Sequence, residues 1–199
     1  VRAGVMITSD KCYRNIDQIW GYREYDGLGG DDPYSSSKAC AEHIINTYSK
    51  CYFNGDSAPA IASTRAGNVI GGGDWSENRL VPDCFRSLFA KKPIKIRNPD
   101  STRPWQHVLE PLSGYLLLGE KMLSNPKKIS GSWNFGPSIE FTYTVSDVAK
   151  EIVKHWGEGK IMIERKQKFY ESPLLQLDCA KARVELGWVP NLTFEESIA

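Results

Sequence analysis

Apolar residues recur along the whole chain in two patterns, short β-branched runs and longer stretches with helical spacing. The short runs predict strands at 4–8, 60–65, 94–96, 132–135 and 161–163. The longer stretches predict helices at 33–53, 80–91, 109–123, 145–156 and 181–186, with Pro33 in the first turn of one and Thr144 as the N-cap of another. Strands that alternate with helices are typical of an α/β protein with a largely parallel sheet.

Composition narrows the classes of partner. The 199 residues carry a net charge of +1, which predicts neither nucleic acid nor an acidic membrane surface as a partner. No apolar run is long enough to span a membrane, so we expect no membrane partner. The five cysteines and three histidines are widely spaced and include no C-x-x-C pair, which argues against a disulfide framework and a metal site. Reduced thiols are usual in the cytoplasm, where we expect the protein.

Two candidate catalytic residues stand at the start of the 33–53 helix. Tyr34 and Lys38 are four residues apart, so they share one face of the helix. A lysine ammonium close to a phenol favours the phenolate, which can remove a proton from a hydroxyl group while a hydride leaves the same carbon. The Y-x-x-x-K spacing alone arises by chance on many helices, so the pair needs support from its surroundings.

Ser9, Asp10 and Lys11 supply that support, because they follow the first predicted strand. Open α/β sheets bind their ligands at the carboxyl ends of the strands. A hydroxyl, a carboxylate and an amine would then converge with Tyr34 and Lys38. Taken alone, the same three residues are more typical of a polar turn that caps a helix.

Three segments, 8–13 (TSDKCY), 33–38 (PYSSSK) and 65–69 (RAGNV), resemble the extended short-chain dehydrogenase/reductases that modify nucleotide sugars. Most sugar dehydratases of that group carry Thr-Asp-Glu where this chain has Ser-Asp-Lys at 9–11. The lysine, together with RPWQHVLEP at 103–111, is similar to the members that dehydrate CDP-glucose. The resemblance covers nearly the whole chain.

For the fold, the resemblance implies a Rossmann-like parallel sheet, of which this chain holds the C-terminal half only, with a smaller mixed α/β substrate domain. Residues 1–72 and 100–136 would belong to the NAD-binding part, and 73–99 and 137–199 to the nucleotide-sugar domain. The G-x-x-G-x-x-G fingerprint that binds the dinucleotide pyrophosphate does not occur in the sequence. We therefore expect on the order of a hundred residues before Val1, and weak or no NAD binding by the chain alone.

For the chemistry, the resemblance implies conversion of CDP-glucose to CDP-4-keto-6-deoxyglucose with NAD as cofactor. Tyr34 would take the proton of the sugar C4 hydroxyl, and Lys38 would lower the tyrosine pKa and bind the nicotinamide ribose. Ser9 would hydrogen-bond the C4 oxygen, and Asp10 would be the acid for the departing C6 hydroxyl. Lys11 stands where the family has its glutamate base, and its role stays open. The implied cofactor-binding residues are Tyr34, Lys38 and Arg65.

Five residues are candidates for binding the substrate. Arg103 and Arg79 suit the diphosphate, because a guanidinium matches phosphate geometry, and Asn68 resembles the family asparagine that meets it. Lys95 lies on a strand that faces the nucleobase in related enzymes. Glu171 resembles a carboxylate that holds the ribose hydroxyls, although its flanking sequence departs from the family pattern. A solvated surface charge is the alternative for any one of these.

Other functions stay open. A nucleotide-sugar 4-epimerase, or a dehydratase that uses another nucleotide, would share Tyr34 and Lys38, but an epimerase needs no acid–base pair for elimination. Asp10 and Lys11 therefore favour a dehydratase. A non-catalytic dinucleotide-sensing protein would have no use for the full set of candidate residues. We expect CDP-glucose or a similar nucleotide sugar as the small-molecule partner and a homodimer or homotetramer built on the helix of Tyr34.

Overall fold

A three-stranded parallel sheet organises the first part of the molecule. The computed structural model describes residues 1–55, 57–140, 142–164 and 174–199. The strands β1 (Ala3–Ile7), β2 (Ala60–Ala66) and β6 (Gly131–Phe135) lie side by side in the order β1-β2-β6. The α/β class with a parallel sheet is confirmed.

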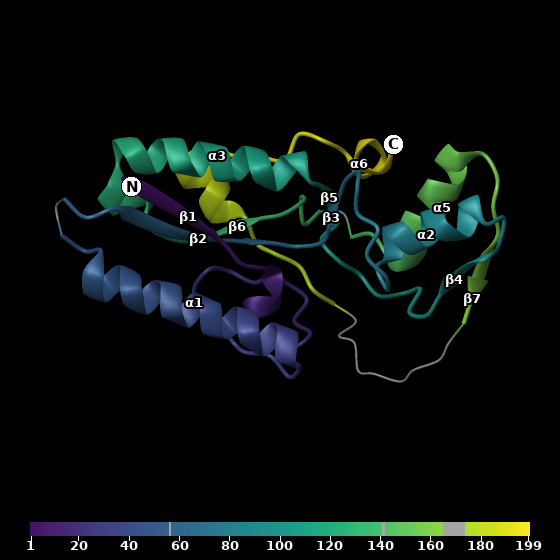
Figure 1. Ribbon diagram of the computed structural model, residues 1–199, viewed down its shortest axis with the longest axis horizontal. Coiled ribbons are helices and arrows are strands. Elements are labelled where there is room, and N and C mark those ends of the chain that lie inside the picture. Colours follow the sequence, from purple (N-terminus) through teal and green to yellow (C-terminus); the bar gives the residue numbers. More distant parts are fainter. Residues whose placement is uncertain (56, 141, 165–173) are drawn as a thin grey trace.

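Two long helices connect the strands and cover the two faces of the sheet. Helix α1 (Pro33–Tyr52) lies against one face and α3 (Leu109–Ser124) against the other (Figure 1). Parallel strands need such crossover connections, since a tight turn can join only antiparallel neighbours. The carboxyl ends of the three strands consequently share one edge of the sheet, and β1 leads there into the one-turn helix η1 (Asp10–Cys12).

Alternation along each strand sends consecutive side chains to opposite faces. On β6, Trp133 and Phe135 join the apolar core beneath α3, while Ser132 and Asn134 make polar contacts on the other face. Gly114 allows α3 to approach closely, because a Cβ there would lie 2.3 Å from Cδ1 of Phe135. The two faces of one sheet therefore have different interiors.

A short parallel pair of strands, β3 (Val69–Ile70) and β5 (Gln106–His107), lies between the two parts of the molecule in Figure 1. Beyond this pair lies a second lobe. It contains the elements α2 (Leu80–Phe89), β4 (Ile94–Ile96), α5 (Val145–Trp156) and β7 (Ile161–Ile163). Its core consists of Ile70, Cys84, Leu88, Ile94, Ile96, Trp105, Val148, Ala149 and Ile152. This lobe thus has a separate apolar cluster, as a second small domain requires.

Local sequence explains where the main helices begin. Asp32 caps α1 by accepting from the amides of Tyr34 (2.9 Å) and Ser35 (3.0 Å), with Pro33 as the first helical residue. The predicted N-cap Thr144 is confirmed, and Asp147 completes a capping box with it.

The C-terminal segment differs from the predicted division into domains. The apolar residues in this segment that pack into the core of the sheet are Leu175, Leu177, Cys179, Ala182, Leu186 and Trp188. Two short helices, η2 (Ala182–Leu186) and α6 (Phe194–Ile198), close the chain. Residues 175–188 therefore pack with the sheet β1-β2-β6, whereas the sequence predicted that all of 137–199 belongs to the nucleotide-sugar domain.

The periodic elements were predicted well and the shortest ones were not. Every predicted strand and helix is present within a few residues of its expected bounds. The unpredicted elements are η1, β3, β5, α6 and α4 (Pro126–Ile129). Segments of two to five residues are too short to display a hydrophobic period, so only their tertiary partners define them.

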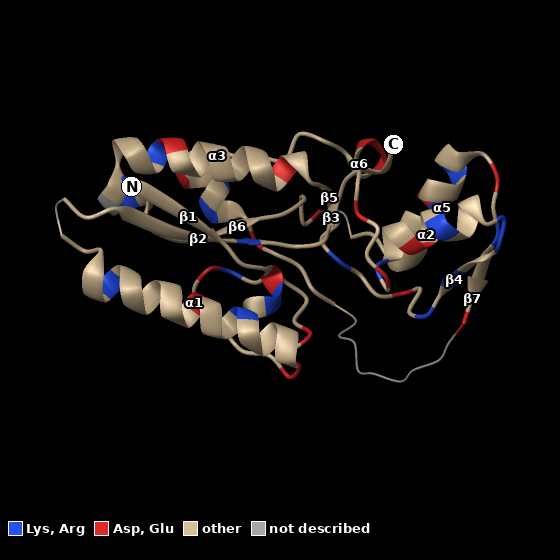
Figure 2. Cartoon of the chain, viewed as in Figure 1, with Lys and Arg blue, Asp and Glu red and all other residues tan. Residues whose placement is uncertain are grey.

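Charges of both signs are distributed over the two lobes, without one sign gathering on either (Figure 2). None of the helices in the described part of the chain is long and apolar enough to cross a membrane. Across residues 1–55, 57–140, 142–164 and 174–199, no three His, Cys, Asp or Glu side chains cluster where they could hold a metal ion. The five cysteines are unbridged thiols.

Candidate active site at the end of the first strand

The turn after β1 is held by its own side chains. The Ser9 hydroxyl caps η1 by accepting from the Lys11 amide at 3.2 Å and donates to Oδ1 of Asp10 at 3.0 Å. Both Ser9 and Asp10 are buried. The turn lies beside the first half of α1 (Figure 1), so the two halves of the predicted constellation are neighbours.

Asp10 is a carboxyl group in unusual surroundings. It is 3% exposed, and its Oδ2 atom has no hydrogen-bond partner among the described residues. Burial raises the pKa of Asp10 above its usual value of 3.8, although the charges of Lys11 and Arg103 and the Ser9 hydrogen bond act in the opposite direction. A carboxyl with a raised pKa keeps its proton to higher pH, as a general acid must.

Lys11 and Arg103 bring positive charge to this turn. Lys11 lowers the pKa of Asp10 and also that of Asp32, the cap of α1, so its ammonium acts on both carboxyls. The Asp32 pKa is lowered mainly by the hydrogen bonds from Ser35. Lys11 thus links the strand end electrostatically to the start of α1.

Tyr34 and Lys38 face outward from the first turns of α1. Tyr34 is 56% exposed, and the Lys38 ammonium lies 5.5 Å from the centre of its ring. Neither the phenol oxygen nor the ammonium hydrogen-bonds to another group in the part of the chain that the structure describes. An exposed phenol with a cation nearby is available to a ligand, which a tyrosine buried in the core would not be.

Arg103 lines a small hollow between the lobes. The hollow also contacts Trp105, Tyr143 and Gln176. Arg103 is buried and donates from Nη1 to the Thr102 carbonyl at 2.7 Å, and its charge reaches Asp10. Arg103 therefore acts electrostatically on the carboxyl of the turn.

The other predicted substrate-binding residues are placed differently. Asn68 is half-buried, and its carbonyl accepts from the Gln106 amide at 3.1 Å where β3 and β5 pair. Arg79 and Lys95 are exposed in the second lobe, where Arg79 pairs with Asp74 at 2.8 Å and Lys95 with Glu164 at 3.4 Å. Neither lines the hollow of Arg103. Glu171 lies outside the described residues.

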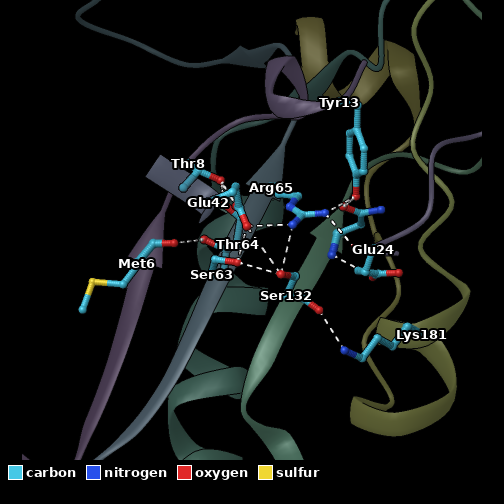
Figure 3. Close-up of polar contacts among 11 residues, drawn as sticks. Met6, Thr8, Tyr13, Glu24, Glu42, Ser63, Thr64, Arg65, Ser132 and Lys181 are labelled. Carbon is cyan, nitrogen blue, oxygen red and sulfur yellow. Dashed lines mark hydrogen bonds and ion pairs between the residues drawn. The ribbon is translucent and has the colours of Figure 1, made fainter. Parts of the chain in front are cut away.

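Arg65 does not have the surroundings of a cofactor ligand. It is 2% exposed, and its guanidinium donates to Glu42 (2.7 Å), the Tyr13 hydroxyl (2.8 Å), the Glu24 carbonyl (3.0 Å) and the Ser132 hydroxyl (3.0 Å), as Figure 3 shows. The predicted contact with the cofactor disagrees with this placement, because four protein groups enclose the guanidinium. Arg65 instead pairs with Glu42 inside the protein.

Sequence reasoning missed Glu42, the buried partner of Arg65. A signal was present, because Tyr34, Lys38 and Glu42 follow one another at intervals of four residues on one helix. This spacing puts the Glu42 carboxylate on the same face of α1 as Tyr34 and Lys38, one turn further along the helix. Only the packing shows that this glutamate turns inward, with 2% of its side chain exposed.

Parallel strands with a buried acid at their carboxyl edge, beside an exposed tyrosine and lysine on the next helix, define an α/β fold of the dehydrogenase/reductase class. The sequence profile of the GDP-mannose 4,6 dehydratase family matches residues 5–199. The chain belongs to that family.

Curated relatives agree with this assignment. The chain is 44% identical to the CDP-glucose 4,6-dehydratase of Salmonella typhimurium (strain LT2), in a match covering 100% of this chain and 56% of the relative. It is 26% identical to the dTDP-glucose 4,6-dehydratase of Haemophilus influenzae, over 96% of this chain and 57% of that protein. The chain thus spans a little more than half the length of these relatives.

Solved structures show the same fold. A UDP-glucose-4-epimerase from Stenotrophomonas maltophila, with bound NAD and formylated UDP-arabinopyranose, superposes with a TM-score of 0.84 at 17% identity, over 100% of this chain and 61% of that one. The dTDP-glucose 4,6-dehydratase of Bacillus anthracis in complex with NAD has a TM-score of 0.79 at 23% identity, over 98% and 58%. Dehydratases and epimerases therefore share this framework, and the site residues must separate them.

Proposed function

We propose that the whole protein converts CDP-glucose to CDP-4-keto-6-deoxyglucose as an NAD-dependent 4,6-dehydratase. The observation that carries the proposal is Asp10, a buried carboxyl with a raised pKa beside the helix of Tyr34 and Lys38. An elimination of water needs such a proton donor, and a 4-epimerisation does not. The 44% identity to a CDP-glucose 4,6-dehydratase favours cytidine as the base of the nucleotide.

The residues present fit one end of a dinucleotide. The outward-facing hydroxyl of Tyr34 and ammonium of Lys38 can hydrogen-bond the ribose hydroxyls next to a nicotinamide. They stand at the carboxyl edge of a parallel sheet, where this class of fold binds its ligands. When bound there, NAD⁺ supplies the acceptor that takes a hydride from sugar C4 and later returns it to C6.

Tyr34 and Ser9 act on the C4 hydroxyl in this proposal. The Tyr34 phenolate takes the hydroxyl proton as C4 is oxidised to a ketone. Lys38, one turn further along α1, favours the phenolate by its positive charge and transfers no proton itself. Ser9 holds the C4 oxygen in place with its hydroxyl.

Asp10 and Lys11 act on C6 and C5. The C4 ketone acidifies the C5 proton, which passes to a base at the position of Lys11, while the departing C6 hydroxyl takes a proton from Asp10 and leaves as water. Lys11 stands where the family places its base for the C5 proton, but a base must be neutral and Lys11 acts as a cation toward Asp10 and Asp32. We therefore propose Asp10 as the acid and keep the role of Lys11 as a prediction.

Arg103 and Asn68 are the proposed contacts for the diphosphate, at the junction between the sheet and the second lobe. Arg79, Lys95 and Glu171 stay as predicted contacts of the nucleoside. The substrate would thus lie between the NAD-binding part and the nucleotide-sugar domain, with the sugar toward Asp10.

Incubation of the whole protein with NAD⁺ and each of CDP-, dTDP-, UDP- and GDP-linked hexoses tests the proposal. The expected result is a 4-keto sugar, detected by its absorbance in base and by the loss of one water in mass spectrometry, with CDP-glucose as the preferred substrate. Preference for another nucleotide would reject cytidine. A C4 epimer in place of the keto sugar would reject dehydration, and no reaction with any substrate would favour a non-catalytic role.

We also propose a cytoplasmic homodimer or homotetramer. Helix α1 exposes a row of large apolar side chains, Ile44, Tyr48 and Tyr52, and a second copy would remove them from water. Light scattering of the whole protein tests this assembly, and a monomer at micromolar concentration would contradict it.

A further inference from the structure

Helix α1 buries an unexpected set of side chains. The residues it turns toward the protein interior are Ser35, Ala39 and Glu42, whereas Ile44, Tyr48 and Tyr52 are exposed. A helix that covers a sheet usually buries its large apolar residues. Among the described residues, Glu42 is the only charged group of α1 that is buried, so its burial needs an explanation.

Glu42 receives hydrogen bonds from β2, from β6 and from the residue that follows β1. Thr8 donates from Oγ1 to Oε1 at 2.5 Å, and Ser63 donates from Oγ to Oε2 at 2.8 Å. Arg65 donates from Nη2 to Oε2 at 2.7 Å, and Ser132 lies at 3.4 Å from the same oxygen. Figure 3 shows these groups converging on the carboxylate from β1, β2 and β6.

The bond to Thr8 connects the two halves of the proposed active site. Thr8 directly precedes Ser9 and Asp10, and its own amide bonds the Thr64 carbonyl at 2.9 Å. Glu42 stands one helical turn after Lys38 and two turns after Tyr34. A single carboxylate thus joins the helix of the base to the strand end of the acid.

We propose that Glu42 is a positioning residue, which sets the place of Tyr34 and Lys38 relative to Ser9 and Asp10 through its hydrogen bond with Thr8. The inference rests on the proposed function and deepens it. A hydrogen bond to a carboxylate is short and directional, so it defines both the rotation and the axial position of α1. Apolar contacts alone would allow the helix to slide.

Arg65 keeps this carboxylate charged. Burial pushes the pKa of Glu42 up, but the hydrogen bond and charge of Arg65, with the hydroxyls of Thr8 and Ser63, more than offset it, and the pKa falls below its usual value of 4.5. Arg65 is held in turn by the Tyr13 hydroxyl, which donates onward to Asn134 at 2.7 Å. The network therefore extends from α1 to β6.

Two variants separate positioning from general support. Thr8→Val keeps the shape of the side chain and removes the link from Glu42 to the end of β1, together with the 3.1 Å bond from Thr8 Oγ1 to the Thr64 carbonyl, while Ser63 and Arg65 still bind the carboxylate. Ser132→Ala is the matched control, since Ser132 bonds the same Arg65 and Ser63 groups but lies on β6, away from the strand end. Thr8→Ser restores the hydroxyl, and Thr8→Ala serves as a second deletion of it.

The whole protein is assayed for kcat, KM and Tm with CDP-glucose. For Thr8→Val we expect kcat to fall about tenfold or more with KM within about threefold, since misplacing reacting groups by an ångström lowers the rate without weakening binding. Thr8→Ser and Ser132→Ala should stay within about twofold of the wild type. A kcat of Thr8→Val equal to the wild type, or a loss as large in Ser132→Ala, would overturn the inference.

Hydrogen exchange gives a readout that needs no catalysis. The Cys12 and Tyr13 amides close the η1 turn on Ser9 and Asp10, and they should exchange faster in Thr8→Val but not in Ser132→Ala. Equal exchange in both variants would refute positioning even if the wild type proved inactive on CDP-glucose. Faster exchange in Thr8→Val with no activity in the wild type would retain the positioning role and reject the proposed reaction.

Discussion

The sheet β1-β2-β6 is covered by α3 through apolar side chains and by α1 through charged and hydroxyl groups. Between α3 and the sheet lie Leu118 and Met122 of the helix and Trp133 and Phe135 of β6, all of them without measurable exposure. Beneath α1, the corresponding place is occupied by the Glu42–Arg65 pair. Both arrangements attach one helix to the same three strands.

The difference between the faces follows from their tasks. Apolar packing is strong and non-directional, so it is suited to a helix that only has to stay attached. Hydrogen bonds to a buried carboxylate work only at one distance and angle, and their loss leaves a buried charge unpaired. The face that carries the proposed chemistry is therefore the one with the more exacting attachment.

The largest expected effect concerns the outer side of α1. Tyr34→Phe removes the phenol oxygen proposed to take the proton of the C4 hydroxyl, and we expect kcat to fall by about 10³ to 10⁴. The Tm should not change, because the Tyr34 side chain is exposed and its oxygen bonds no described group. Steady-state kinetics and calorimetry of the same sample check both parts. Residual activity near that of the wild type would remove Tyr34 from the mechanism.

One substitution on each face of the sheet should lower the free energy of unfolding, each for a different physical reason. Glu42→Ala leaves Arg65 buried without its partner and should cost about 3–5 kcal/mol. Leu118→Ala opens a cavity beneath α3 and should cost about 2–5 kcal/mol. Similar losses at neutral pH would therefore arise from unlike causes.

The stability losses of Glu42→Ala and Leu118→Ala should depend differently on pH. The pKa of Glu42 is lowered from 4.5 in the folded protein, so its contribution is complete above the unfolded pKa and disappears as pH falls through the folded pKa. In urea unfolding, the gap between Glu42→Ala and the wild type should narrow as pH falls from about 7 to about 3. The gap between Leu118→Ala and the wild type should stay constant, and a gap at Glu42 that does not change with pH would contradict the ion-pair account.

Asp10→Asn tests the acid. It should lower kcat by about 10² to 10³, because an amide cannot supply the proton for the departing hydroxyl. Burial raises the pKa of Asp10 above 3.8, so the limb of the wild-type pH–rate profile that reports Asp10 should fall as pH rises through the raised pKa. Ionising Asp10 also costs folding stability as pH rises, so Asp10→Asn should remove that dependence. A pH–rate profile and unfolding curves of both proteins measure these changes.

The smallest expected effects compare two glycines on α3. A Cβ at Gly114 would lie 2.3 Å from Phe135, so Gly114→Ala should cost about 1–3 kcal/mol through overpacking. At Gly119 the nearest atom is Cγ2 of Val5 at 3.9 Å, and Gly119→Ala should stabilise the helix by about 0.5–1 kcal/mol. Thermal unfolding of both variants checks the opposite signs. Destabilisation by both would mean that the apolar face tolerates no added atom at either position.

Local pattern predicted the elements that carry the site. The β-branched run before Ser9 and the helical spacing after Pro33 place the candidate residues on a strand end and on a helix. The four-residue spacing of Tyr34 and Lys38 likewise puts them on one face, because the geometry of a helix is the same in every protein.

Burial could not be predicted in the same way. Arg65 was expected at the cofactor and is enclosed by protein instead, since its partners Glu42, Glu24 and Ser132 come from 23, 41 and 67 residues away. The C-terminal segment that includes Trp188 was assigned to the wrong core for the same reason. Contacts at such separations depend on how the crossover helices pack.

The sequence by itself determined the order of strands and helices, the parallel α/β class and the residue types available for proton transfer. Those properties depend on hydrophobic period, capping and spacing, which act over a few neighbouring residues. The tertiary structure decided which charged groups lie in the interior. Desolvation raises the pKa of Asp10 and Arg65 counteracts it at Glu42, and both effects arise only once distant segments exclude water from the same place.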